Sequence, residues 1–199
     1  MKEVQDESKI EKLLKMPSHG YTSNFHKREM WKEIAKSFNG EFKIKFDSSK
    51  TYEMHYITIP HKKWEISITV SDTRPLKFQV FFSSRMEFDI ELSLSDFIDK
   101  ILIKLDKKEI KLSSQEFNKH YLIRSSKSDL AKQLMTAKIQ KAILESNLFS
   151  ICYKTNTESQ KAELMSMIQR SADDKDFIIA LIKLHQDLID RLSELKIII

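Results

Sequence analysis

Hydrophobic residues recur at two different periods along the chain, and the period changes near Gly40. Between about Ser23 and Phe38 the apolar positions follow the three- and four-residue spacing of an amphipathic helix. Four residues share the apolar face of this predicted helix: Trp31, Ile34, Ala35 and Phe38. Asn39-Gly40 suits the end of the helix, because glycine adopts the left-handed conformation at little cost.

After Gly40, apolar and polar residues alternate, which is typical of strands with one buried face. The alternating segments are "EFKIKF", "TYEMHYITIP", "KWEISITV", "LKFQVFF" and "MEFDIEL". We expect Pro60 to close the second of them. The polar turns between these segments are too short for a crossover helix, so the pattern predicts an antiparallel meander rather than a parallel sheet.

The second half of the chain mixes helical and strand patterns. Helices are predicted over "DFIDKILIKL", over one turn at "SSQE", from the Ser126–Asp129 capping box through a bend near Thr136, and from Asp173 to Leu195. Strands are predicted at "KHYLIRS" and "NLFSICYKT". Residues 158–170 fit either a helix or the second arm of a hairpin with "CYKT", and we favour the hairpin.

These elements predict an α+β fold, in which an antiparallel β-meander is packed by N-terminal and C-terminal helices. We expect residues 1–20 to form a helical extension that ends at Pro17, and residues 21–199 to form a single α+β domain. The apolar tail Ile197–Ile199 is expected to pack back on the fold or into a partner, so self-association through it and the last helix is a candidate interaction.

Three stretches resemble a bacterial family of soluble domains of unknown function. They are "WKEIAKSFNGEF", with its Trp-x-x-Ile-Ala helix ending at a glycine, "KWEISITVSDTRPLKF", and "SSQEFNKHYLIRSSKSDLAKQLM". The likeness covers about residues 30 to 195. The glycine expected before the Phe117 stretch is absent. The resemblance implies α+β architecture and a bacterial origin, and it implies no activity.

Composition narrows the function classes. The 199 residues include only two glycines, so Gly-rich phosphate-binding loops are excluded. The single cysteine, Cys152, excludes internal disulfides; we expect it to be a small buried hydrophobe in a reduced, cytoplasmic protein. No apolar run is long enough to span a membrane, and no signal peptide is apparent. The net charge of +5 is spread along the chain without a basic run, so nucleic-acid binding is not expected.

Four groups of residues are candidates for a functional site, and each is better explained by a structural role. The six histidines lack metal-ligand spacing. Glu87, Asp89 and Glu91 are expected on a solvated strand face, paired with lysines such as Lys77. Cys152 lies among apolar neighbours, where a thiolate is disfavoured, so we do not expect it to act as a nucleophile. The fourth is a basic and aromatic patch, which we dismiss because Trp64 is in phase with the predicted core; its members are Lys43, Lys45 and His61–Trp64.

The sequence therefore predicts no catalytic, cofactor-binding or metal-binding residue. Our first hypothesis is a non-enzymatic binding or interaction module. The alternative is a carrier that holds an apolar small molecule between sheet and helices, with Tyr56, Phe78 and Phe88 as the candidate lining. An enzyme without a recognisable motif is the third hypothesis.

Overall fold

A nine-stranded antiparallel sheet forms the centre of the protein in the computed structural model, which describes residues 24–46, 53–71, 74–95, 108–168 and 174–199. The strands lie in the order β1-β2-β3-β4-β9-β8-β5-β7-β6. Their bounds are β1 Glu41–Phe46, β2 Glu53–His61, β3 Trp64–Ser71, β4 Arg74–Ser83, β5 Ile90–Leu94, β6 Lys108–Ile110, β7 Tyr121–Ser125, β8 Ser150–Asn156 and β9 Lys161–Ile168. The α+β prediction is confirmed, as is the hairpin that places residues 161–168 in a strand.

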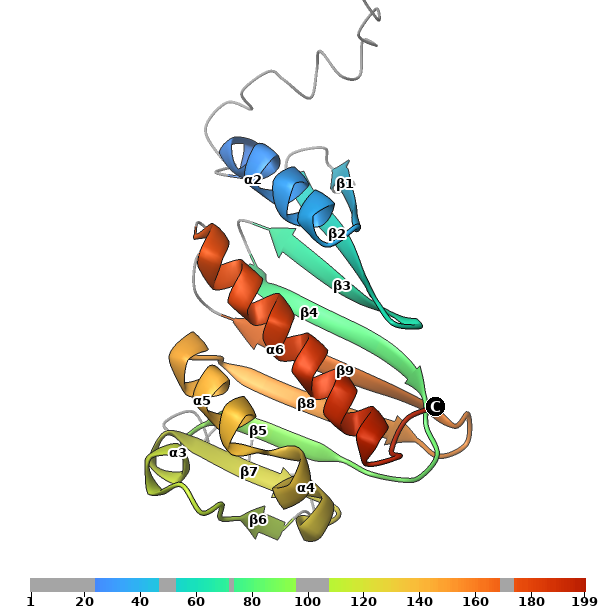
Figure 1. The fold of residues 1–199 in the computed structure, drawn as a ribbon, viewed down its shortest axis with the longest axis vertical. Coiled ribbons are helices and arrows are strands. Elements are labelled where there is room, and N and C mark those ends of the chain that lie inside the picture. The colour runs from blue at the N-terminus through green and yellow to red at the C-terminus, as the bar shows by residue number, and fades with distance from the viewer. Residues whose placement is uncertain (1–23, 47–52, 72–73, 96–107, 169–173) are drawn as a thin grey trace, which may run out of the picture.

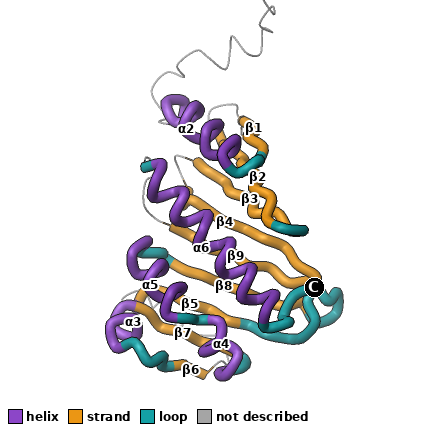
Figure 2. The backbone as a smooth tube through the Cα atoms, in the orientation of Figure 1, coloured by secondary structure: helices purple, strands orange, loops and turns teal. Residues whose placement is uncertain are grey.

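The described helices cover one face of this sheet (Figure 1). They are α2 Asn24–Ser37, α3 Gln115–His120, α4 Ser128–Leu134, α5 Ala137–Ser146 and α6 Lys175–Glu194. Helix α6 crosses the middle of the sheet, α2 covers β1 and β2, and the three short helices lie over the opposite end (Figure 2). The helices predicted within residues 1–20 and 96–105 fall outside the described residues.

Alternating side chains build the core beneath the helices. On β3, Trp64, Ile66, Ile68 and Val70 are buried, while the residues between them face the side of the sheet that carries no described helix. The predicted core position of Trp64 is therefore confirmed. Its ring meets Phe82 edge-on at 5.9 Å between ring centroids. Burial of this kind stabilises a fold by roughly 25 cal/mol per Å² of apolar area.

The C-terminal tail packs back on the sheet. Ile197 and Ile198 are buried, and the backbone N–H of Ile199 donates to the carbonyl of Ser83 at 2.9 Å. Ser84 and Ile198 also form an isolated antiparallel bridge. Of the three predicted contact residues, Ile199 alone leaves about half of its surface exposed. Self-association through this tail and the last helix stays a prediction, with Ile199 as the exposed residue of the three.

A buried ion pair joins α2 to β2. Arg28 on α2 donates from Nε to Glu53 Oε1 at 2.8 Å, and its Nη2 contacts the other carboxylate oxygen. His55 Nε2, two residues along β2, also donates to Glu53. All three residues are less than a tenth exposed. The pair fixes α2 on the sheet edge through charged hydrogen bonds.

Three local predictions are wrong. Pro60 lies within β2 opposite Glu65, near the end of the strand where the neighbouring β1 has already stopped, so its missing N–H costs no ladder bond there. Ser126 does not cap α4: its hydroxyl accepts from the backbone N–H of Asp89 at 2.9 Å, and this contact between the neighbouring ends of β5 and β7 takes the place of the cap. Cys152 is half-buried on the face without described helices rather than in the core.

Candidate functional site

The candidate lining residues for an apolar ligand lie in two separate places. Phe78 and Phe88 are fully buried in the core, where Phe78 stacks on His185 at 4.3 Å and Phe88 packs against Tyr153 at 5.7 Å between ring centroids. Tyr56 is half-buried on the other side of β2, with Lys45 Nζ 4.8 Å from its ring centroid. The structure does not bring the three together.

The three alternating carboxylates do not share a strand face either. Strand β5 begins at Ile90, so Glu87 and Asp89 precede it. Asp89 accepts from the backbone N–H of Thr155 at 2.9 Å, whereas Glu87 is exposed. Glu91 lies on β5 between Arg124 of β7 and Cys152 of β8. Lys77, expected as their partner, lies on β4, which does not adjoin β5.

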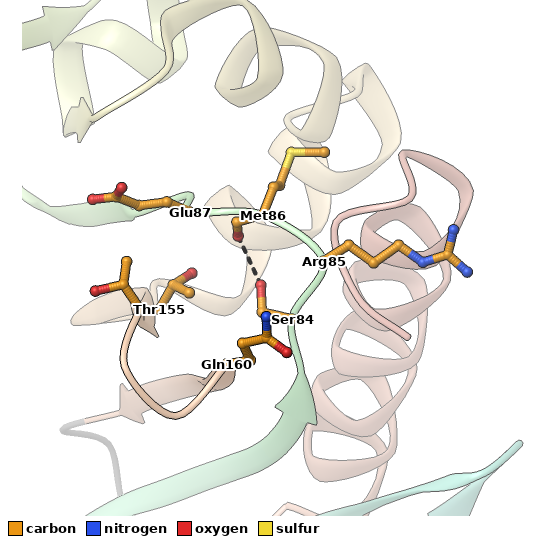
Figure 3. A pocket seen from close by; sticks show the side chains of 7 residues that line it. Ser84, Arg85, Met86, Glu87, Thr155 and Gln160 are labelled. Carbon is orange, nitrogen blue, oxygen red and sulfur yellow. Dashed lines mark hydrogen bonds between the residues drawn. The ribbon is translucent and has the colours of Figure 1, made fainter.

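A small hollow of about 140 Å³ lies where β4 leaves the sheet, beside Ser84 and Thr155 (Figure 3). Two of its hydroxyl groups are already bonded to the chain: Ser84 donates to the carbonyl of Met86 at 2.7 Å, and Thr155 donates to that of Phe88 at 2.8 Å. Arg85 points away from Glu87 in this view. These contacts indicate a structural corner that holds the β4–β5 connection.

Two larger hollows meet under α5, and we call them together the α5 groove. The first has a volume of about 420 Å³ and the second about 300 Å³, and Ser113 and Gln140 line both. The first is also lined by Lys111, Leu112, Lys132 and Met135, and the second by Ser114, Glu116, Ala137, Lys141 and Leu144. The volumes fall within the range of small-molecule sites.

The corner between α4 and α5 forms one wall of the groove. Helix α4 ends at Met135, and the Thr136 hydroxyl caps α5 by accepting from the backbone N–H of Ile139 at 3.3 Å. Gln140 follows in the first turn of α5, with its own N–H bonded to the Thr136 carbonyl. This cap sets the direction of the helix and points the Gln140 side chain back toward the corner.

The Gln140 side chain has one bonded and one unbonded end. Its Nε2 donates to the carbonyl of Met135 at 2.6 Å, and since a carbonyl only accepts, this contact fixes which end of the amide is the nitrogen. The Oε1 atom is buried and accepts no hydrogen bond from the described residues. Only 7% of the residue's surface is exposed. A buried acceptor without a donor costs about 1–3 kcal/mol, and this Oε1 has almost no surface within reach of solvent. Gln140 therefore braces the wall shared by both hollows through its bond to Met135, while its Oε1 stays enclosed.

The segment before α3 forms the opposite wall. Asn118 on α3 holds it with a pair of hydrogen bonds: its Oδ1 accepts from the backbone N–H of Leu112 at 2.9 Å, and its Nδ2 donates to the Leu112 carbonyl at 2.7 Å. Ser114 caps α3 through the N–H of Phe117 at 3.2 Å. Residues 111–114 are thereby set at a fixed distance from α5.

Replacing Asn118 with alanine is expected to lower the free energy of unfolding by about 1–3 kcal/mol, because both Leu112 backbone groups lose their partner. The amide resonances of residues 111–114 should shift in a 1H–15N spectrum, while those of α2 stay in place. Chemical denaturation measures the stability change. Lys119→Ala, an exposed neighbour on α3, should change stability by less than about 0.5 kcal/mol. An Asn118→Ala protein as stable as the parent would show that the side-chain clamp does not hold this wall.

The groove combines positive charge with an apolar floor. Lys111 and Lys132 reach the larger hollow, and Lys141 and Glu116 reach the smaller one. Lys111 also contacts Glu109. Leu112, Met135 and Leu144 supply apolar surface below these charges.

The histidines that the structure describes do not converge. His55 and His185 are buried, His61 Nε2 contacts Asp190 at 2.7 Å, and His120 ends α3. No cluster of three or more His, Cys, Asp or Glu residues suited to a metal ion occurs in the part of the chain that the structure describes. Likewise, none of the described helices combines the length and apolar character needed to cross a bilayer.

Comparisons with known proteins support the architecture and little more. No protein-family model matches the sequence, and no curated protein matches it significantly. The resemblance drawn from the Trp-x-x-Ile-Ala pattern is therefore supported only as α+β architecture. Among solved structures, the mycobacterial trehalose monomycolate transport factor A, TtfA, is similar with a TM-score of 0.50 and 11% identity, over 82% of this chain and 94% of that chain.

Proposed function

We propose that the protein is a non-enzymatic binding protein that holds a small ligand in the α5 groove. The groove itself carries this proposal, because its two adjoining hollows of about 420 and 300 Å³ combine amide, hydroxyl and ammonium groups with apolar surface, as small-molecule sites do. A reduced, cytoplasmic setting, inferred from the lone Cys152, belongs to the same proposal.

The chemistry of the groove favours binding over catalysis. Its polar groups are an amide, two serine hydroxyls and lysine ammonium groups, with Glu116 as the acidic group among its described lining residues. Amide and hydroxyl groups bond to a ligand without exchanging protons near neutral pH. Such groups orient a polar ligand rather than activate a bond.

The groove also suits a ligand better than the interface between sheet and helices does. An apolar molecule at Phe78 would have to separate its ring from His185, and one at Phe88 would have to displace Tyr153. A carrier of an amphiphilic molecule is compatible with the groove, whose floor is apolar beneath a charged rim. The name of TtfA concerns transport of trehalose monomycolate, which is a reason to test amphiphiles as well as polar solutes.

Replacing Gln140 with methionine is expected to abolish ligand retention, because methionine keeps the side-chain length but removes the amide of a residue that lines both hollows and braces their shared wall by bonding to the Met135 carbonyl. Native mass spectrometry of the freshly purified full chain should show a co-purified mass that is at least ten-fold depleted in Gln140→Met. The ligand should be recovered chemically unchanged after incubation with the protein.

Lys138→Met is the matched control, because Lys138 lies on α5 but its ammonium contacts Asp187 of α6 at 2.7 Å, away from the groove. This variant should retain the ligand as the parent does. Equal ligand content in the parent and Gln140→Met, no bound mass in either, or conversion of the bound molecule would each contradict the proposed function.

A further inference from the structure

We infer that two copies of the protein associate through β1, which pairs antiparallel with β1 of the second copy and continues the sheet across a two-fold axis. This inference is independent of the α5 groove, which lies toward the other end of the sheet (Figure 1). Three features of β1 carry it: an open backbone edge, a partly exposed apolar side, and charges that complement those of a second β1.

Strand β1 is the longer of the two outer strands of the described sheet. It has six residues and β6 has three, and neither meets another described strand on its outer side. The outward N–H and C=O groups of an edge strand can pair with a strand of another chain. Because a very short edge strand limits such pairing, β1 is the described edge that is long enough for it.

The apolar side of β1 is only partly covered. Phe42, Ile44 and Phe46 alternate on the side of the sheet that faces the core. Phe42 meets the ring of the buried His55 edge-on at 5.0 Å between ring centroids. Phe42 and Ile44 are nevertheless half-buried, and Phe46 leaves 44% of its surface exposed. A second β1 laid alongside removes part of this apolar surface from water.

The charges on the other side of β1 select the strand that can pair with it. Glu41, Lys43 and Lys45 alternate there and are exposed. Lysines on an edge strand disfavour most incoming strands. A second β1 placed with Lys43 opposite Lys43 puts Glu41 of each copy opposite Lys45 of the other, and opposite charges across a sheet stabilise the pairing. Each Lys43 ammonium also contacts its own Glu41, which lowers the repulsion between the two lysines at the axis.

Other registers of the same pairing are poorer. A shift of two residues in one direction places Lys43 opposite Lys45, and like charges directly opposite destabilise a sheet. The opposite shift places Glu41 opposite Lys43 but leaves only residues 41–43 of each copy paired. The register centred on Lys43 pairs residues 41–45 of both copies. An interface of this size lies at the small end of protein–protein interfaces, so the dimer should dissociate on dilution.

The test is sedimentation velocity of the full chain over a dilution series, in which we expect the parent to form a dimer that dissociates on dilution. Glu41→Lys makes positions 41 and 45 both positive, and Lys45→Glu makes them both negative, so each variant alone should associate at least ten-fold more weakly than the parent. Mixed in equal amounts, the two variants should form a heterodimer at least ten-fold tighter than either variant alone, because opposite charges then face each other at both ends of the pairing.

Lys119→Glu is the matched control, because it changes the net charge as Lys45→Glu does but lies on α3 over the other end of the sheet. Its association should stay within two-fold of the parent. The three substituted side chains are exposed, so all variants should keep the parental melting temperature.

Cysteine crosslinking reads the register directly. In a Cys152→Ser background, Lys43→Cys lies opposite itself, where the Cα atoms of facing residues are about 4.5–5.5 Å apart and within the range of a disulfide. This variant should form a covalent dimer under mild oxidation. Lys45→Cys faces Glu41 of the second copy and should crosslink at least ten-fold more slowly.

Four results would overturn the inference. They are a parent that stays monomeric at every concentration, a mixture of the two charge variants that associates no better than each alone, equal crosslinking of Lys43→Cys and Lys45→Cys, and a dimer that both charge variants retain. If such a dimer dissociates in Ile199→Lys, self-association belongs to the C-terminal tail instead. The co-purification experiment separately decides the proposed function.

Discussion

Replacing Arg28 with methionine is expected to lower the free energy of unfolding by about 3–5 kcal/mol, the range found when one partner of a buried ion pair is removed. Burial alone raises the pKa of Glu53, but hydrogen bonds from Arg28 and His55 outweigh it and hold this pKa at about 2. Without the guanidinium, the carboxylate stays buried with one donor side chain fewer. Urea denaturation at pH 7 measures the loss.

Two further variants test whether the loss of stability comes from the buried ion pair. Lys32→Met lies one turn along α2 and removes an exposed pair with Glu29, so it should change stability by less than about 0.5 kcal/mol. Arg28→Met/Glu53→Leu removes both charges and should recover more than half of the loss, because the uncompensated carboxylate is gone. A loss below about 1 kcal/mol in Arg28→Met would contradict the role given to this ion pair.

Acidification from pH 6.5 to pH 4 is expected to destabilise the fold by about 3 kcal/mol through His185 alone. Burial in the core lowers the pKa of His185 to about 4, although the hydrogen bond to the Leu181 carbonyl favours the charged form. At neutral pH the ring is uncharged: Nδ1 donates to Leu181 at 2.7 Å, and Nε2 accepts from the Ser166 hydroxyl at 2.9 Å.

The direction of this change in stability follows from proton uptake by the unfolded chain. Below pH 6.5 the unfolded chain binds a proton at this histidine and the folded chain does not, so protons favour unfolding until the folded pKa is reached. Glu53 acts in a lower window, because its contribution is complete above pH 4.5 and is lost toward pH 2. Unfolding free energies of the parent and His185→Gln, measured from pH 7 to 4, should therefore converge as the pH falls. Parallel pH profiles would refute a buried neutral His185.

Local periodicity predicted which segments form strands and helices better than it predicted which strands lie next to each other in the sheet. Alternation of Trp64, Ile66 and Ile68 specifies which face of β3 is buried, and a two-residue turn specifies that β3 follows β2 in the sheet. Nothing in "LKFQVFF" shows that β4 pairs with β9 rather than with β5, because that pairing joins segments about 85 residues apart. The same distance effect explains Ser126, whose bond to Asp89 joins residues 37 positions apart in the chain.

The α5 groove was not predicted, although one signal was present. Gln140 stands three residues before Ile143 and four before Leu144, so it occupies a position in the apolar stripe of α5. A polar residue inside such a stripe requires either an internal partner or a ligand. The second wall could not be inferred, because Lys111 and Ser113 come within reach of α5 only through the Asn118 clamp and the packing of α3.

The insertion of β9 beside β4 also affects how the chain folds during its synthesis. Strands β1 to β4 form successive hairpins and can pair as they emerge from the ribosome. The outer backbone edge of β4 stays open until residues 161–168 have been synthesised, roughly 80 residues later. During that interval Phe78, Val80 and Phe82 border an unpaired edge, the kind of surface that recruits other strands. Slow translation between β4 and β9 therefore exposes the nascent chain to aggregation, and binding by a chaperone in this window would protect it.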